Sequence, residues 1–148
     1  MNTSARGNKI VLHVDDDEDD HELMREVLKE QNSDMIIHHA ENGVAALDYL
    51  NQVRKSGNLP GLIIVDINMP KMGGKEFVME LKKDPDLSRI PMVIFTTSTF
   101  DADKAFANKY GVEFFTKPTS WTQLSEILKR LLHLLSLGYA LFNLCGIV

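Results

Sequence analysis

The sequence has almost no cysteine and no apolar leader. Cys145 is the single cysteine, so no disulfide can form within the chain. The polar segment from Met1 to Lys9 lacks the apolar core of a secretory signal. Both features are typical of proteins from a reducing compartment, and we therefore expect a cytoplasmic protein.

Clusters of basic residues are also missing. The chain carries 16 Lys and Arg residues against 21 Asp and Glu residues, which gives a formal net charge of -5. Six of the acids stand together from Asp15 to Asp20, and the remainder of the chain is close to neutral. Binding of nucleic acid through its phosphates requires a basic patch, so DNA and RNA are not expected as partners.

Long hydrophobic runs are missing until the end of the chain. The segment from Leu131 to Val148 has no Asp, Glu, Lys or Arg across 18 residues, which is about the shortest length of a membrane span. His133 and Asn143 interrupt this segment, so we expect an apolar extension that folds back or meets a partner, and not a span. The expected organisation is a flexible start (1–8), one domain (9–135) and the apolar extension (136–148).

Short apolar runs alternate with stretches of helical periodicity along the domain. This alternation is typical of repeated βα units around a parallel sheet. Right-handed crossovers then favour a doubly wound α/β sheet, and we predict five strands in the order 2-1-3-4-5. The strands are expected at Ile10–Val14, Met35–His39, Leu62–Asp66, Met92–Thr96 and Val112–Thr116.

Helices are predicted between these strands from their apolar periodicity and end signals. Acids early in the first helix suit the positive end of its dipole, and Gly111 is expected to end the fourth helix. The expected helices are 19–31, one that begins after Asn42-Gly43, 74–83, 101–110 and one capped by Ser120.

Polar residues stand at the ends of four predicted strands. Asp15 and Asp16 follow the first strand and Asp66 ends the third, while Thr96 ends the fourth and Lys117 follows the fifth. Because the carboxyl ends of parallel strands share one edge of the sheet, we expect one pocket. Two carboxylates about 4 Å apart repel by roughly 4 kcal/mol at an effective dielectric near 20, so three of them would either hold protons or demand a cation. Mg²⁺ prefers such oxygen ligands, and the pattern predicts phosphoryl chemistry.

Four segments carry a resemblance to a known family. They are Val14-Asp15-Asp16, the run from Val65 to Gly74, Phe95-Thr96-Thr97-Ser98 and Phe115-Thr116-Lys117-Pro118. Together they resemble the receiver domain of two-component response regulators, and the resemblance covers about residues 9–135. It implies a flavodoxin-like receiver fold. The Thr96-Thr97-Ser98 run is further similar to stand-alone receivers that work with phytochrome-type sensor kinases.

The resemblance implies a role for each acidic residue. Asp66 would accept a phosphoryl group from a histidine kinase or a histidine phosphotransfer protein, giving an aspartyl phosphate. Mg²⁺ would be held by Asp15, Asp16, Asp66 and the backbone carbonyl of Asn68. The side chain of Asn68 would also tune the loss of the phosphate. Such a domain is not an enzyme in the usual sense, since it catalyses only its own phosphoryl transfer and dephosphorylation.

The resemblance also implies roles for the later segments. Thr96 and Lys117 would contact the phosphoryl group, with a cis peptide between Lys117 and Pro118 that aims the lysine. Phosphorylation would draw Thr96 inward and let Phe114 rotate, although Phe114 stands where relatives often have tyrosine. Ser98 would tune dephosphorylation, and its neutral hydroxyl predicts slow self-dephosphorylation, which a phosphate lifetime of seconds would contradict.

The output of such a domain would be binding to other proteins. The expected output surface combines the fourth helix, the fifth strand and the fifth helix. A downstream protein partner would bind there, and the surplus apolar residues of the fifth helix and the extension motivate a homodimer through the same surface.

Two alternatives belong to other classes of protein. A phosphatase that resembles the haloacid dehalogenase group would use Asp15 as nucleophile together with Asp17. It leaves Asp66 unexplained, and no second acidic pair follows Lys117 to complete its metal site. A docking module that works without phosphate is the other alternative, and the complete acidic set argues against it.

The remaining acids and the histidines are interpreted without a chemical role. The acids from Asp17 to Asp20 fit a solvated helix start. The histidines show no repeated metal spacing, and neighbours on a strand point to opposite faces, so no ligand role is expected for them. The histidines are His13, His21, His38, His39 and His133.

Overall fold

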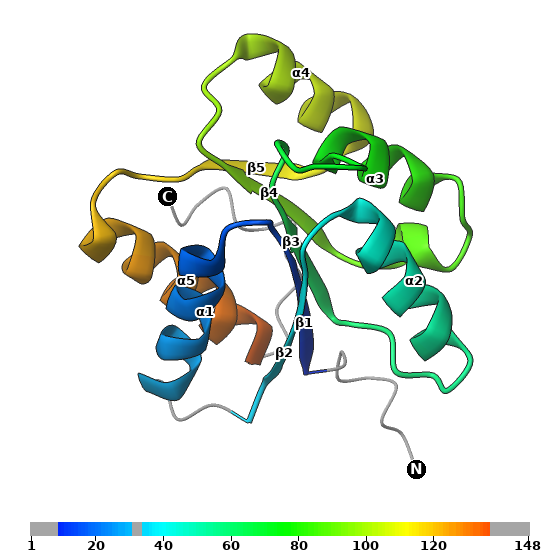
Figure 1. Ribbon diagram of the computed structural model, residues 1–148, viewed down its shortest axis with the longest axis horizontal. Coiled ribbons are helices and arrows are strands. Elements are labelled where there is room, and N and C mark those ends of the chain that lie inside the picture. The colour runs from blue at the N-terminus through cyan, green and yellow to red at the C-terminus, as the bar shows by residue number, and fades with distance from the viewer. Residues whose placement is uncertain (1–8, 31–33, 137–148) are drawn as a thin grey trace.

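One parallel sheet of five strands organises the chain, in the order β2-β1-β3-β4-β5 (Figure 1). The computed structural model describes residues 9–30 and 34–136. The predicted strand order is confirmed; two strands have the predicted bounds, and the other three differ by one residue at one or both ends. The strands are β1 (Ile10–Val14), β2 (Ile36–Ala40), β3 (Leu62–Val65), β4 (Met92–Thr96) and β5 (Glu113–Thr116).

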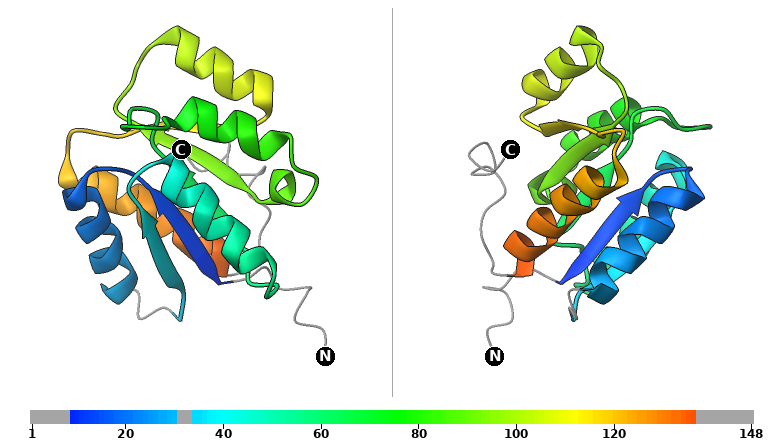
Figure 2. Two further views of the ribbon diagram at one scale, coloured as in Figure 1. Left: turned by 45° about the vertical axis from the view of Figure 1, so that its right-hand side comes forward. Right: turned by 90° about the vertical axis from the view of Figure 1, so that its left-hand side faces the viewer.

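Helices cover both faces of the sheet. Helices α1 and α5 lie side by side on one face, and α2, α3 and α4 lie on the other (Figures 1 and 2). A short 3₁₀ helix, η1, which we did not predict, precedes β4. The bounds are α1 (Glu18–Glu30), α2 (Gly43–Arg54), α3 (Gly74–Lys82), η1 (Leu87–Arg89), α4 (Asp101–Tyr110) and α5 (Trp121–Ser136).

The central strands are buried on both faces, which explains their continuous apolar runs. Each residue of β3 and of β4 is buried. Side chains alternate between two cores, so Val11 packs under α1 and α5 while Leu12 packs under α2 and α3. Full burial of a side chain of this size stabilises the fold by about 1.5–3 kcal/mol. The two cores hold the strand ends at fixed positions.

Local contacts set two of the helix ends. Helix α4 ends at Gly111 as predicted, whereas α2 begins at Gly43, one residue before its predicted start. The Asn42 side chain accepts a hydrogen bond of 3.0 Å from the backbone N–H of Ala45 and so caps α2. Gly111 ends α4 with a φ of 66°, in the left-handed region that favours glycine. The local sequence therefore determines these boundaries.

The described helices were also compared with the length of a membrane span. None of those within residues 9–30 and 34–136 is both long enough and apolar enough to cross a bilayer. The predicted start 1–8 and residues 137–148 of the predicted extension lie outside the described residues.

The loop between β3 and α3 is tightly packed at Gly74. The N–H of Gly74 donates a 2.9 Å hydrogen bond to the carbonyl of Ile67, which folds the loop back on itself. A Cβ atom at position 74 would clash with the carbonyl oxygen of Asp66 and would lie 2.9 Å from the Cα atom of Ile67. Both neighbours are backbone atoms, so only glycine fits without moving the Asp66 loop.

Replacement of Gly74 by alanine should therefore destabilise the protein. We expect Gly74→Ala to lower the free energy of unfolding by about 1–3 kcal/mol, because the added methyl overpacks fixed backbone. Urea denaturation followed by circular dichroism measures this change. A denaturation midpoint equal to that of the wild type would contradict the proposed close packing.

Gly57 offers a matched control for this variant. It has a φ of 74°, and a Cβ atom there would meet no atom within 4 Å. Gly57→Ala should cost about 1–2 kcal/mol through backbone conformation alone. Only Gly74→Ala should also weaken divalent cation binding, because only that variant displaces Asp66.

Candidate functional site

Three carboxylates gather at the carboxyl edge of the sheet. Asp15 and Asp16 directly follow β1, and Asp66 directly follows β3. The two strands are paired, and the N–H of Asp66 donates a 3.0 Å hydrogen bond to the carbonyl of Val14. One carboxylate oxygen from each aspartate lies within 4.8 Å of the others. The adjacency of the first and third strands, expected from the order 2-1-3-4-5, thus brings the acids together.

Lys117 supplies the positive charge between these acids. Its Nζ atom lies 2.8 Å from Asp15, 2.5 Å from Asp20 and 3.4 Å from Asp66, in each case from the Oδ2 atom. Burial by itself lowers the pKa of Lys117, but the charges of Asp15 and Asp66 outweigh burial and raise it above its usual range. The ammonium group is therefore permanently charged in this pocket.

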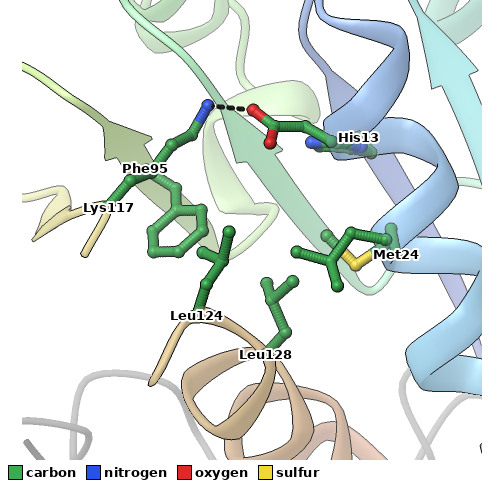
Figure 3. A pocket seen from close by; sticks show the side chains of 8 residues that line it. His13, Met24, Phe95, Lys117, Leu124 and Leu128 are labelled. Atoms are coloured by element: carbon green, nitrogen blue, oxygen red, sulfur yellow. Dashed lines mark hydrogen bonds and ion pairs between the residues drawn. The ribbon is translucent and has the colours of Figure 1, made fainter. Parts of the chain in front are cut away.

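A small pocket lies beside the ammonium group, on the face covered by α1 and α5. Figure 3 shows the Lys117 side chain near the ring of Phe95, with His13 across the pocket. Leu124 and Leu128 of α5 line the apolar end. The aliphatic part of Lys117 thus runs along apolar side chains while its charged end meets the carboxylates.

Asp15 is the most deeply buried of the acids. Its side chain is 1% exposed. Burial raises the pKa of Asp15 to about 7, although Lys117 lowers it and partly opposes this effect. One carboxylate oxygen accepts a 3.0 Å hydrogen bond from the N–H of Asp17, and the other contacts Lys117. Both oxygens of Asp15 are therefore engaged within the protein.

Asp66 is more accessible than Asp15. Its side chain is 13% exposed. Its Oδ1 atom accepts a 2.7 Å hydrogen bond from the N–H of Ile67, and its Oδ2 atom faces Lys117. Asp66 thus presents a carboxylate to solvent beside a fixed cation, which is what an attacking nucleophile in phosphoryl transfer requires.

The donor set of the pocket fits a hard divalent cation. The three clustered ligand groups are all carboxylates, and Asp16 is exposed, so a cation can enter from solvent. Lys117 provides one positive charge against the carboxylates of Asp15, Asp20 and Asp66. The negative charge in excess favours an oxygen-preferring ion such as Mg²⁺.

Asp20 belongs to this pocket, which our interpretation of the acidic run as a solvated helix start missed. It lies in the first turn of α1, and its carboxylate is 2.5 Å from the Nζ atom of Lys117. Acids are favoured at helix starts in any case, so the local pattern could not single out Asp20. Its partner is 97 residues further along the chain.

The segment after β4 is held by a second polar network. Thr96 is fully buried, and its hydroxyl oxygen accepts a 3.3 Å hydrogen bond from the N–H of Ser98. The Ser98 hydroxyl donates to Asp103 of α4, which also forms a 2.5 Å ion pair with Lys75 of α3. Hydrogen bonds from Lys75 and Ser98 lower the pKa of Asp103. The loop is thus tied to both helices.

The predicted geometry at Pro118 is wrong. The described residues contain no cis peptide bond, so the peptide between Lys117 and Pro118 is trans. The N–H of Lys117 donates a 2.7 Å hydrogen bond to the carbonyl of Thr96, which extends the pairing of β5 with β4. This pairing and the carboxylates around its Nζ atom direct Lys117 into the pocket. Phe114, on β5, is half-buried against the core below α4.

Comparisons with known proteins identify the family of this chain. The response regulator receiver domain family matches residues 11–129. Response regulator Rcp1 of Synechocystis sp. is 38% identical over 105 residues, which are 70% of this chain and 71% of that protein. The structure of the phosphorylated cyanobacterial phytochrome response regulator RcpA has a TM-score of 0.79 and 31% identity, covering 86% of this chain and 93% of RcpA.

A metal-bound structure is also similar. The Mn²⁺-bound form of Rcp1 has a TM-score of 0.76 and 33% identity, covering 82% of this chain and 90% of that one. The extent of the family match, the identity to Rcp1 and the shared fold lead to one conclusion. This chain belongs to the response regulator receiver domain family of two-component signalling.

Proposed function

We propose that the protein is a phosphorylated switch that accepts a phosphoryl group on Asp66. A carboxylate oxygen of Asp66 forms a bond to phosphorus, while the bond from phosphorus to a histidine nitrogen of the donor breaks and the electron pair leaves with that nitrogen. The observation that carries this proposal is the accessible Asp66 carboxylate beside Lys117 and two further aspartates. The donor is a histidine kinase or a histidine phosphotransfer protein.

The accessibility of the two candidate nucleophiles favours Asp66 over Asp15. Both oxygens of each aspartate accept hydrogen bonds, but the Asp15 side chain is 1% exposed whereas that of Asp66 is 13% exposed and holds Lys117 at the longer distance of 3.4 Å. A bulky phosphodonor therefore reaches the carboxylate of Asp66 more easily than that of Asp15. The phosphatase alternative requires the less accessible Asp15 to attack. The alternative of a docking module that works without phosphate does not explain why Lys117 is buried among carboxylates.

Mg²⁺ is the proposed cofactor, held by Asp15, Asp16, Asp66 and the backbone carbonyl of Asn68. The clustered carboxylates support this assignment, as does the Mn²⁺-bound structure of the similar Rcp1. When bound, the cation neutralises charge that builds on the transferred phosphoryl oxygens. Asp15 and Asp16 hold it in place, and Asn68 lies two residues beyond the acceptor, where its side chain tunes the loss of the phosphate.

Lys117 and Thr96 are proposed to contact the phosphoryl group after transfer. A phosphoryl group on Asp66 competes with Asp15 and Asp20 for the Nζ atom of Lys117, because phosphate oxygens carry more charge. The Thr96 hydroxyl turns from Ser98 toward the phosphate. Ser98 tunes the rate of dephosphorylation. We expect that rate to be slow, because the Ser98 hydroxyl already donates to Asp103.

The proposed switch leads from this pocket to a protein-binding surface. Movement of Thr96 leaves space into which Phe114 rotates, and α4, β5 and α5 present the change to a partner. The exposed Phe100 at the start of α4, 72% accessible, gives this surface an apolar contact point. The similarity to a phytochrome response regulator supports a phytochrome-type sensor kinase as the upstream partner. Residues 9–135 form the signalling domain in this proposal.

The acceptor can be identified by direct mapping. With acetyl phosphate and Mg²⁺, the wild type should gain one phosphoryl group on Asp66, located by mass spectrometry after peptide digestion. Asp66→Asn should abolish this modification, because an amide oxygen is not a competent nucleophile. Asp48→Asn, on the exposed face of α2, should leave it unchanged. Modification of Asp15 would instead support the phosphatase alternative, and no modification would support the docking module.

Lys117 should act as an internal competitor of the cation. Its ammonium group compensates the carboxylates, so Lys117→Met should bind Mg²⁺ roughly tenfold more tightly, as expected for the loss of one nearby positive charge. The same variant should accept the phosphoryl group more slowly. Isothermal titration calorimetry measures the first effect and single-turnover phosphorylation the second. The matched control is Lys55→Met, because Lys55 is the exposed C-cap residue of α2. Unchanged Mg²⁺ affinity in Lys117→Met would refute this competition.

The output surface is also proposed to form a homodimer. Sedimentation of the wild type with Mg²⁺ and beryllofluoride should show a dimer that Phe100→Ser weakens, because the substitution removes an exposed apolar side chain. The variant Val44→Ser, at an exposed position of α2, serves as control. Only monomers with and without beryllofluoride would exclude the dimer.

A further inference from the structure

Three histidines lie together beside the carboxylate pocket, on the side of Asp15, which His13 and His21 both approach. His13 on β1 and His39 on β2 are direct partners in the parallel pairing, and His21 of α1 covers the same face of the sheet. Their ring centroids are 4.3 to 5.6 Å apart. One ring nitrogen from each histidine lies within 4.8 Å of the others. The strand pairing thus builds a cluster that residue spacing along the chain does not indicate.

We propose that His13, His21 and His39 form a second metal site, which takes a divalent ion that prefers imidazole ligands, with Zn²⁺ as its representative. This site differs in chemistry from the carboxylate pocket, since imidazole nitrogen suits Zn²⁺ whereas carboxylate oxygen suits Mg²⁺. The proposal does not depend on phosphorylation of Asp66.

The hydrogen bonds of His21 match those of a metal ligand. Its Nε2 atom lies 2.5 Å from the backbone carbonyl of Asp15, and because a carbonyl only accepts, Nε2 carries the proton. The Nδ1 atom of His21 therefore carries a lone pair, which accepts a 2.5 Å hydrogen bond from the Nδ1 atom of His39. An ion bound between the two nitrogens would replace that proton. Ligating histidines usually donate their other ring N–H to a carbonyl or carboxylate in this way.

Two ring nitrogens of the cluster are buried without a hydrogen-bond partner. They are the Nδ1 atom of His13 and the Nε2 atom of His39. The His13 side chain is 3% exposed, and a buried polar atom left unpaired costs about 1–3 kcal/mol. His13 does not pair closely at its other nitrogen, which lies 3.8 Å from the Asp15 carboxylate. A metal ion would give this imidazole a partner.

Burial also favours the neutral form of two of the three rings, those of His13 and His39. Burial, with smaller effects from His21, His39 and Lys117, lowers the pKa of His13 well below its usual value. Burial and the neighbouring His21 lower the pKa of His39 to about 4. Both rings are neutral at pH 7, so binding does not require loss of a proton from either.

The geometry needs only a small adjustment, and the site has a route of entry. Zn²⁺ binds nitrogen at about 2.0–2.1 Å, so tetrahedral ligands stand about 3.3 Å apart. The Nδ1 atoms of His21 and His39 must separate by less than about 1 Å, and the other pairs of ring nitrogens, which are at most 4.8 Å apart, must approach by no more than about 1.5 Å. His39 is partly exposed on the edge strand β2, and we expect an ion and a fourth ligand from solvent to approach the cluster from that edge.

Zn²⁺ titration of the full chain tests the proposal. The protein is first stripped with a chelator, and saturating Mg²⁺ is then added to occupy the carboxylate pocket. Calorimetry should detect a site of one Zn²⁺ per chain whose affinity falls at least tenfold in His39→Gln. The matched control is His38→Gln, because His38 is the neighbour on β2, points to the other face and stacks on Tyr49 at 3.8 Å. Equal affinity in wild type and His39→Gln would overturn the proposal.

Two further measurements separate this site from the carboxylate pocket and from misfolding. Asp16→Asn should leave Zn²⁺ binding intact, and loss of binding in that variant would place the ion at the carboxylates instead. Nitrogen NMR of the histidine rings in the wild type needs no substitution. Zn²⁺ should shift the ring nitrogens of His13, His21 and His39 and leave those of His38 in place. Shifts confined to other histidines would overturn the proposal.

Discussion

The structure depends on the ion pairs that Lys117 makes at the carboxyl edge of the sheet. Its Nζ atom lies within 3.4 Å of carboxylate oxygens from three aspartates. Carboxylates about 4 Å apart repel by roughly 4 kcal/mol for each pair at an effective dielectric near 20. The acids that follow β1 and β3 repel one another, and Lys117, which follows β5, offsets part of that repulsion. The ammonium group leaves an excess of negative charge that a divalent cation can meet.

The sheet gives these ion pairs a rigid frame. Strands β1, β3 and β4 are packed on both faces, and the Asp66 loop touches Gly74 so closely that no side chain fits there. Asp15 is buried at the end of such a strand, and burial raises its pKa to about 7. A carboxylate in this position is costly to keep charged unless a cation is near. The fold therefore holds negative charge that favours cation binding, and the proposed phosphoryl transfer would use that cation.

The sequence allowed most of the fold to be predicted because its signals are local. Apolar runs, Asn42 and Gly111 mark element ends, and right-handed crossovers leave few sheet orders for such a chain. The predicted strand order makes β1 and β3 neighbours, and this alone was enough to predict that Asp15, Asp16 and Asp66 lie together. Asp20 and the histidine cluster could not be predicted in this way. Their neighbours come from distant segments, so only the register between strands and the rotation of α1 place them.

The same strand register connects the pocket to the rest of the molecule. Thr96 pairs with Thr116 across β4 and β5, and its carbonyl accepts from the N–H of Lys117. Its hydroxyl is held by Ser98, which is bound in turn to Asp103 and through it to Lys75. A displacement of Thr96 must therefore be absorbed either by Lys117 or by the network that joins α3 to α4. Lys117 is confined by carboxylates and by the β4–β5 pairing, so the proposed switch would move the network beside α4, which adjoins the proposed output surface.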